Sequence, residues 1–178
     1  MLWPDTIRTG RLVLRRPVDA DAQALFDGYA QDPEVVRHLT WRTHATVAET
    51  RAFIARARAG WDAGVDLSWA ITMEGDDRLI GMIGMRPRAF KHDIGYVLAR
   101  PYWGKGIMSE AARTIVELAF TDPAVYRVWA VCDIDNAASA RVMEKAGMTR
   151  EGVLRRWIVH PNVSPEPRDA LCYSRVRD

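Results

Sequence analysis

A short turn with two glycines carries the clearest chemical signal in the sequence. Gly104 and Gly106 lie between an apolar run that ends at Leu98 and a helical pattern that starts near Ile107. Glycine lacks a Cβ atom, so its backbone can approach an anion closely, and the first turn of a helix offers unpaired N–H groups and a positive dipole end. The turn therefore predicts a phosphate or pyrophosphate site. An ordinary strand-to-helix connection is the alternative that a glycine pair alone leaves open.

Two familiar nucleotide-binding loops do not fit this turn. A P-loop requires Lys and a hydroxyl residue after its second glycine, and here Ile107 and Met108 follow. A dinucleotide fingerprint requires a third glycine where this chain has Ser109.

A second helical pattern begins at Asn136, directly after the next strand-like run, and places Ser139 in its first turn. In open α/β arrangements, ligands bind at the carboxyl ends of neighbouring parallel strands. Gly104 and Asn136 are therefore expected at the same edge of a sheet. Two helix starts at one edge favour an anion site over a plain connector.

The elements that position these residues alternate along the chain. A strand over 11–16 precedes two helices, and Thr46 with Glu49 forms a capping box at the start of the second, which reaches about residue 61. The order predicts a mixed α+β fold and a single domain over residues 1–178, with a right-handed crossover after the phosphate turn. The remaining predicted elements are an antiparallel meander over 68–73, 79–85 and 93–98, with a turn at 74–77, helices over 105–120 and 137–146, and strands over 127–132, 148–157 and 169–176.

Composition excludes several classes of protein. The 178 residues include 25 basic and 23 acidic side chains, so the net charge of +2 gives no general reason to expect a nucleic-acid partner. No apolar run approaches the roughly 18 residues of a membrane helix, and we expect a cytoplasmic protein. Cys132 and Cys172 stand far apart, and the four histidines follow no ligand spacing, so no metal site and no disulfide are expected.

Taken together, the motifs resemble the acetyl-CoA-binding motifs of the GNAT N-acetyltransferase superfamily. The opening Thr9-Gly10-Arg11-Leu12-x-Leu14-Arg15 resembles its RimJ/RimL-like branch, which includes acetyltransferases acting on protein N-termini. The resemblance spans about residues 9–176 and departs from the usual pattern at Pro101, where Gln or Arg is common. The other matching residues are Tyr96 to Leu98, Trp103-Gly104-Lys105-Gly106-Ile107-Met108-Ser109-Glu110-Ala111, Asn136-x-x-Ser139 and Glu144-Lys145-x-Gly147.

The resemblance implies a mostly antiparallel central sheet with helices on both faces, in which two splayed parallel strands form the acetyl-CoA cleft. It also implies that backbone amides over 103–108 bind the pyrophosphate and that an N–H group over 96–98 faces the thioester oxygen. Asn136 is expected to bind a pantetheine amide, although an asparagine here also suits a helix cap. The implied cofactor-binding residues are Tyr96, Val97, Leu98, Trp103, Gly104, Lys105, Gly106, Ile107, Met108, Asn136 and Ser139.

Ser139 and Asp93 are the implied catalytic residues. The resemblance places the Ser139 hydroxyl near the cofactor sulfur, where it donates a proton; a bond within its own helix is the alternative. Asp93 stands where many relatives carry an acidic residue and is expected to take a proton from the amine, with a salt bridge as the competing role. Trp41, in the loop before the second helix, is expected to line the acceptor cleft.

The predicted function is direct transfer of an acetyl group from acetyl-CoA to a primary amine, without a metal or an acyl-enzyme. The acceptor is a protein N-terminus or a small molecule such as a polyamine, amino acid or antibiotic, chosen by the loops over 32–45 and 158–168. A non-catalytic acyl-CoA-binding module is the alternative from another class. No nucleic acid or membrane partner is expected, and a homodimer is compatible with the sequence.

Overall fold

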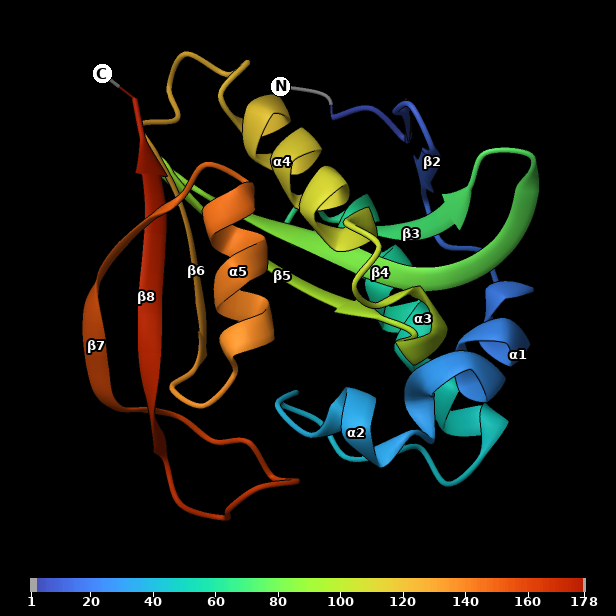
Figure 1. Ribbon diagram of the computed structural model, residues 1–178. Helices are drawn as coiled ribbons and strands as arrows, with labels where there is room; N and C mark the ends of the chain where they lie inside the picture. Colours follow the sequence, from blue (N-terminus) through green and yellow to red (C-terminus); the bar gives the residue numbers. More distant parts are fainter. Residues whose placement is uncertain (1–2, 178) are drawn as a thin grey trace.

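An eight-stranded sheet runs through the computed structural model, which describes residues 3–177 (Figure 1). Its strand order is β1-β2-β3-β4-β5-β6-β8-β7. Every pair of neighbours is antiparallel except β5 and β6, which confirms the predicted mixed sheet. The strands are β1 Thr6–Arg8, β2 Leu12–Arg15, β3 Leu67–Met73, β4 Asp76–Arg88, β5 Lys91–Leu98, β6 Arg127–Asp133, β7 Thr149–Ile158 and β8 Arg168–Val176.

Helices cover both faces of the sheet, with α4 and α5 on the face turned toward the viewer in Figure 1. Side chains alternate between faces along a strand, and in β3 Trp69 packs with the α4 side of the core whereas Ala70 packs with the α1 and α3 side. Within the part of the chain that the structure describes, no helix is long and apolar enough to cross a membrane. The helices are α1 Asp21–Leu25, η1 Phe26–Ala30, α2 Pro33–Val36, α3 Val47–Asp62, η2 Arg100–Tyr102, α4 Ile107–Ala119 and α5 Ala137–Lys145.

Local sequence signals predicted most of these elements. The capping box at the start of α3 is present, because the Thr46 hydroxyl accepts a bond from the Glu49 N–H and the Glu49 carboxylate accepts one from the Ala45 N–H. The predicted turn over 74–77 is wrong in its second half, since β4 already begins at Asp76. Gly75 alone, at φ +83°, supplies the left-handed backbone that the turn needs. The short elements β1 and α2 were not predicted.

The two parallel strands stay paired only at their beginnings. The β5–β6 register joins Lys91, His92 and Asp93 to Arg127, Val128 and Trp129. Beyond this point β5 pairs only with β4, and β6 pairs only with β8. The carboxyl halves of β5 and β6 therefore separate. Each then has a backbone edge that is not paired with the other strand, as expected for a splayed pair.

Close packing of β4 against β5 makes Gly81 a test of this edge. A Cβ atom at Gly81 would lie 2.5 Å from the Val97 carbonyl oxygen and 3.2 Å from the Leu98 Cα atom. We expect Gly81→Ala to lower the free energy of unfolding by about 1–3 kcal/mol, because β5 must shift. Urea denaturation measures the change. Gly28→Ala is the control, since no atom lies within 4 Å of its added Cβ; equal midpoints for the two variants would refute the argument.

Candidate active site

The glycine turn is exposed and has the backbone conformation that only glycine adopts readily. Gly104 and Gly106 have φ angles of +73° and +75°, and a Cβ added at Gly104 would point into open space. Gly106 is the N-cap of α4 and offers no side chain to the first N–H groups of the helix. The Ile107 and Met108 side chains are buried in the core, so their contribution to an anion site comes from the backbone. This arrangement fits the pyrophosphate of acetyl-CoA.

Two residues just before β2, Thr9 and Arg11, hold the glycine turn in place through hydrogen bonds. Arg11 donates from Nε to the Glu110 carboxylate at 2.7 Å and from Nη1 to the Lys105 carbonyl at 3.1 Å, and the Thr9 hydroxyl binds Glu110 too. Burial acts to raise the pKa of Glu110, but these hydrogen bonds and the Arg11 charge outweigh it and keep that pKa below its ordinary value. The opening Thr9-Gly10-Arg11 motif was the signal for this contact, although its role was not predicted.

The open edge of β5 presents backbone donors. The Ala99 N–H binds the Ile80 carbonyl of β4 at 2.9 Å. Since N–H groups alternate sides along a strand, those of Leu98 and Tyr96 point away from β4, toward the side from which β6 has separated. The Trp103 indole N–H binds the Leu98 carbonyl at 2.7 Å and so ties the phosphate turn to this edge. The exposed Lys105 lies beside the Tyr102 ring.

The structure brings Tyr96, Asn136 and Ser139 together at the start of α5. The Asn136 side chain accepts a bond from the Ser139 N–H at 3.1 Å, so the helix cap weighed as its alternative role is present. The Tyr96 phenol oxygen lies 2.9 Å from the Ser139 hydroxyl and 3.0 Å from the Ser139 carbonyl. Burial raises the pKa of Tyr96 well above its ordinary value, so the phenol is protonated at neutral pH. A hydroxyl pair thus lies beside the separated strand ends.

Cys132 lies in the same region but is a weak nucleophile. Burial raises its pKa to about 11, although a hydrogen bond with Ser139 opposes the change. A thiol rather than a thiolate is present at neutral pH, and the thiolate is the reactive form.

Asp93 does not join this group. It lies in the still-paired part of β5, and by strand alternation its side chain leaves the opposite face from that of Tyr96. The carboxylate accepts a bond from Arg86 at 2.5 Å and lies 3.6 Å from Arg88. The salt bridge considered as the competing role of Asp93 is therefore present, and its role as a general base stays a prediction.

The two loops expected to choose the acceptor are tied together. The Asn162 side-chain amide donates to the Val36 carbonyl at 2.8 Å and to the Trp41 carbonyl at 2.7 Å. The half-buried Trp41 ring packs against His44 and Phe53, with centroids 4.8 and 5.9 Å away. No pattern in the sequence pointed to Asn162, because its partners lie more than 100 residues earlier in the chain.

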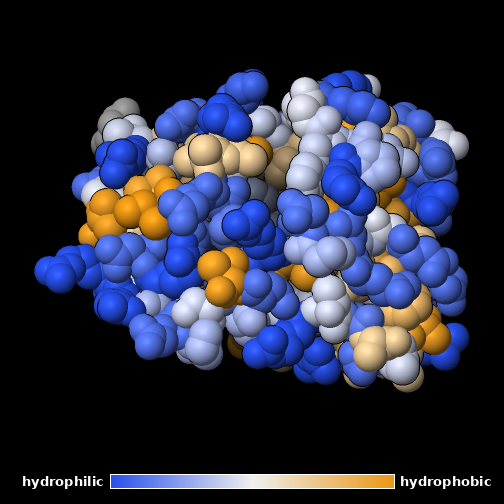
Figure 2. Space-filling model, turned by 60° about the horizontal axis from the view of Figure 1, so that its bottom comes forward, coloured by the Kyte–Doolittle hydropathy of each residue, from blue (hydrophilic) through white to orange (hydrophobic). Residues whose placement is uncertain are grey.

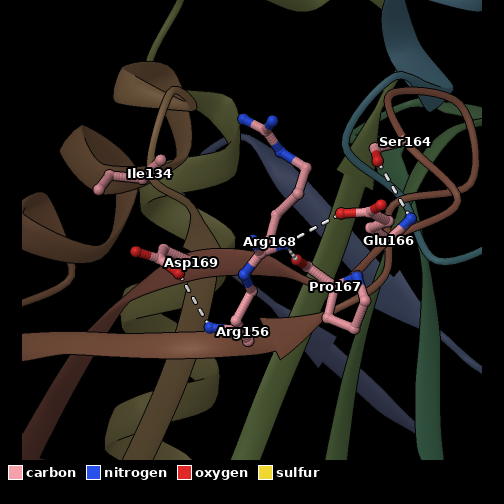
Figure 3. A pocket seen from close by; sticks show the side chains of 7 residues that line it. All are labelled: Ile134, Arg156, Ser164, Glu166, Pro167, Arg168 and Asp169. Carbon is pink, nitrogen blue, oxygen red and sulfur yellow. Dashed lines mark hydrogen bonds and ion pairs between the residues drawn. The ribbon is translucent and has the colours of Figure 1, made fainter.

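Charged side chains dominate a hollow of about 390 Å³ beside the end of β6 (Figure 3). Arg168, one of the residues drawn in Figure 3, pairs with Asp133 and Asp135 at the β6 end. Figure 2 shows that the face containing these loops is mostly hydrophilic, with separate hydrophobic patches. The residues that line the hollow are Ile134, Arg156, Ser164, Glu166, Pro167, Arg168 and Asp169.

Comparison with known proteins identifies the family. Residues 11–149 match the acetyltransferase (GNAT) domain. The uncharacterized N-acetyltransferase YoaA of Bacillus subtilis is 32% identical over 174 residues, which cover 96% of each chain. The chain belongs to the GNAT acetyltransferase family. The resemblance predicted from the motifs is thereby confirmed, and with it an acyltransferase that uses acetyl-CoA.

Two solved acetyltransferase structures share the fold over nearly their whole length. The microcin C7 self-immunity acetyltransferase MccE, in complex with acetyl-CoA and AMP, has a TM-score of 0.87 and 22% identity, and the match covers 99% of this chain and 98% of that one. RimL, a ribosomal L7/L12 α-N-protein acetyltransferase in complex with coenzyme A, has a TM-score of 0.84 and 21% identity, and the match covers 97% of this chain and 98% of that one. At these identities the likeness concerns the fold.

The left-handed backbone at Gly106 gives a direct test of the phosphate turn. We expect Gly106→Ala to strain the turn by about 1–2 kcal/mol and to weaken coenzyme A binding by about tenfold, measured by calorimetry. Gly64→Ala is the matched control, because Gly64 has φ +68° at the end of α3 and introduces similar strain away from the turn. Equal affinities of both variants for coenzyme A would contradict the assigned role.

Proposed function

We propose that this GNAT enzyme transfers the acetyl group directly from acetyl-CoA to a primary amine, the α-amine of a protein N-terminus. The observation that carries the proposal is that the first turns of α4 and α5 follow strands whose carboxyl ends have separated. An α-amine with a pKa near 7.8 needs only about 1 kcal/mol to lose its proton at pH 7, whereas a Lys amine near 10.4 needs about 4.6 kcal/mol. The acidic residues described above, Asp93 and Asp133, are both paired with arginine, which suits the less basic acceptor.

Backbone groups hold and polarise the acetyl donor in this proposal. Acetyl-CoA, when bound, supplies the acetyl group as a thioester. Amides of the 103–108 turn bind its phosphates, in the way that helix starts generally bind anions. One backbone N–H group over residues 96–98 donates toward the thioester carbonyl oxygen, where negative charge develops during attack by the amine.

Ser139 is the proposed proton donor for the departing sulfur. The Tyr96 phenol lies 2.9 Å from the Ser139 hydroxyl and holds it beside the separated strand ends, where the sulfur of a bound cofactor is expected. Because a thiol has an ordinary pKa near 8.5, a weak donor is sufficient. Burial raises the pKa of Cys132 and of Cys172, which argues against an acyl-enzyme on either thiol.

Removing the Ser139 hydroxyl tests the donor role. We expect Ser139→Ala to lower kcat by about 10²-fold, as for other general acids, while the coenzyme A Kd stays within about twofold. The helix start should survive, because its cap bond uses the Ser139 backbone and Tyr96 keeps the Ser139 carbonyl as a partner. Thiol release measures kcat, and Ser174→Ala on β8 is the control. An unchanged kcat in Ser139→Ala would exclude the role.

A panel of amines tests the acceptor class. We expect thiol release from acetyl-CoA with peptides that have a free N-terminus, and none with the same peptides after N-terminal blocking, even when they contain Lys. Polyamines, amino acids and aminoglycosides complete the panel. Turnover confined to these small molecules would overturn the N-terminal acceptor, and binding of acetyl-CoA with no turnover of any amine would indicate a non-catalytic module.

A further inference from the structure

Asp133, at the end of β6, is the centre of a buried polar cluster that the sequence did not predict. Its carboxylate is fully buried and binds Arg168 at 2.6 and 3.1 Å. The His38 Nδ1 atom lies 3.8 Å from one carboxylate oxygen, and the His160 Nε2 atom lies 3.7 Å from the other. Each of the two loops expected to choose the acceptor, 32–45 and 158–168, therefore places a histidine beside the same carboxylate.

The two histidines differ in access. The His160 side chain is 3% exposed, and both of its ring nitrogens are buried without a hydrogen-bond partner. The His38 side chain is 18% exposed, and its buried Nδ1 atom faces Asp133 at ion-pair distance but makes no hydrogen bond. Within residues 3–177, no hydrogen bond or ion pair engages its Nε2 atom, and the partial exposure of the side chain leaves this nitrogen on the accessible side of the ring. Only His38 combines contact with the carboxylate and a free nitrogen.

A short path joins this cluster to Ser139. The Asn136 N–H binds the Asp133 carbonyl at 2.9 Å, and the Asn136 side chain caps the helix at Ser139. Strand alternation turns Asp133 toward the face opposite to its neighbour Cys132, whose thiol contacts Ser139. His38 and Ser139 therefore lie on opposite sides of the β6 end, where a base and an acid can serve the two ends of one transfer.

We propose that His38 is the general base that accepts the proton from the acceptor amine, with Asp133 positioning its ring. This inference rests on the proposed function and deepens it. A neutral amine forms the N–C bond to the acetyl carbonyl carbon, and the C–S bond breaks with its electron pair going to sulfur. The excess proton on nitrogen passes to His38 Nε2, and sulfur takes the Ser139 hydroxyl proton. Solvent then removes the proton from His38 and restores that of Ser139.

The electrostatic surroundings keep the His38 ring neutral. Burial lowers the pKa of His38 below its ordinary value; Asp133 opposes this, whereas His160, Arg37 and Arg168 add to it. The neutral imidazole is the form that accepts a proton. Across residues 3–177, no group of three or more His, Cys, Asp or Glu side chains is arranged to hold a metal ion.

Three variants separate this base from its competitor. With a peptide that has a free N-terminal serine, and with spermidine as a second probe, we expect His38→Gln to lower kcat by about 10²-fold. After the fall of kcat/KM that comes from protonation of the amine itself is divided out, the wild type should keep a further acid limb below pH 6.5, because the pKa of His38 is lowered, and His38→Gln should lose this limb. His44→Gln should keep this acid limb, because His44 lies on the same loop and has a lowered pKa but contacts Thr50. Asp93→Asn should keep it too.

Opposite outcomes overturn the inference. A His38→Gln enzyme with the wild-type kcat and acid limb excludes His38, and loss of the limb in Asp93→Asn moves the base to Asp93. Absence of turnover by the wild type with every amine tested is instead a failure of the proposed function.

Imidazole titration by NMR provides a readout that does not depend on turnover. In the protein without substrates, we expect His38 to titrate below pH 6.5. Asp133→Asn should lower its pKa further, because the carboxylate charge favours the protonated ring, whereas Arg168→Gln should raise it. If Asp133→Asn does not fold, the pKa of His38 in Arg168→Gln tests the coupling by itself. An unchanged His38 pKa in the folded variants would exclude the coupling.

Discussion

The early end of the β5–β6 ladder is the constraint on which the rest of the structure depends. Pairing stops at Asp93 and Trp129, so both strands continue with backbone groups that have no partner in the neighbouring strand. Unpaired backbone groups in a protein interior cost about 1–3 kcal/mol each unless a ligand or water binds them. In the function proposed above, the pantetheine arm of acetyl-CoA binds between these strand ends and supplies such partners.

Several contacts keep this edge open while the rest of the sheet stays closed. Gly81 lets β4 approach β5 closely on the side away from the open edge. The hydrogen bond from Arg11 to the Lys105 carbonyl holds the glycine turn at the end of that edge. The buried stripe of α4 and the bond between Tyr96 and Ser139 hold the two helices beside it. Packing of the surrounding core stabilises the sheet where β5 and β6 make no hydrogen bonds to each other.

The β6 end divides the chemistry between two faces. Donor-side groups gather where α4 and α5 begin, whereas Asp133 faces the loops that carry His38 and His160. Asn162 ties these loops to each other, so the acceptor side is built as one unit. Proteins of one fold can thus hold the donor in a similar way and differ on the acceptor side.

The sequence by itself determined the features that depend on neighbours along the chain. The glycine turn, the capping box of α3 and the order of strands and helices were all readable, and the motifs around the two helix starts resembled the family that the comparisons then showed. Only the tertiary structure decided which distant residues meet: Arg11 reaches Glu110 across 99 positions, Asp93 pairs with Arg86, and His38 joins Asp133. The short elements β1 and α2 were also not predicted, because three or four residues are too few to show the repeat of a strand or helix pattern. Periodicity tells which residues share a face, but strand order and loop paths decide what that face contacts.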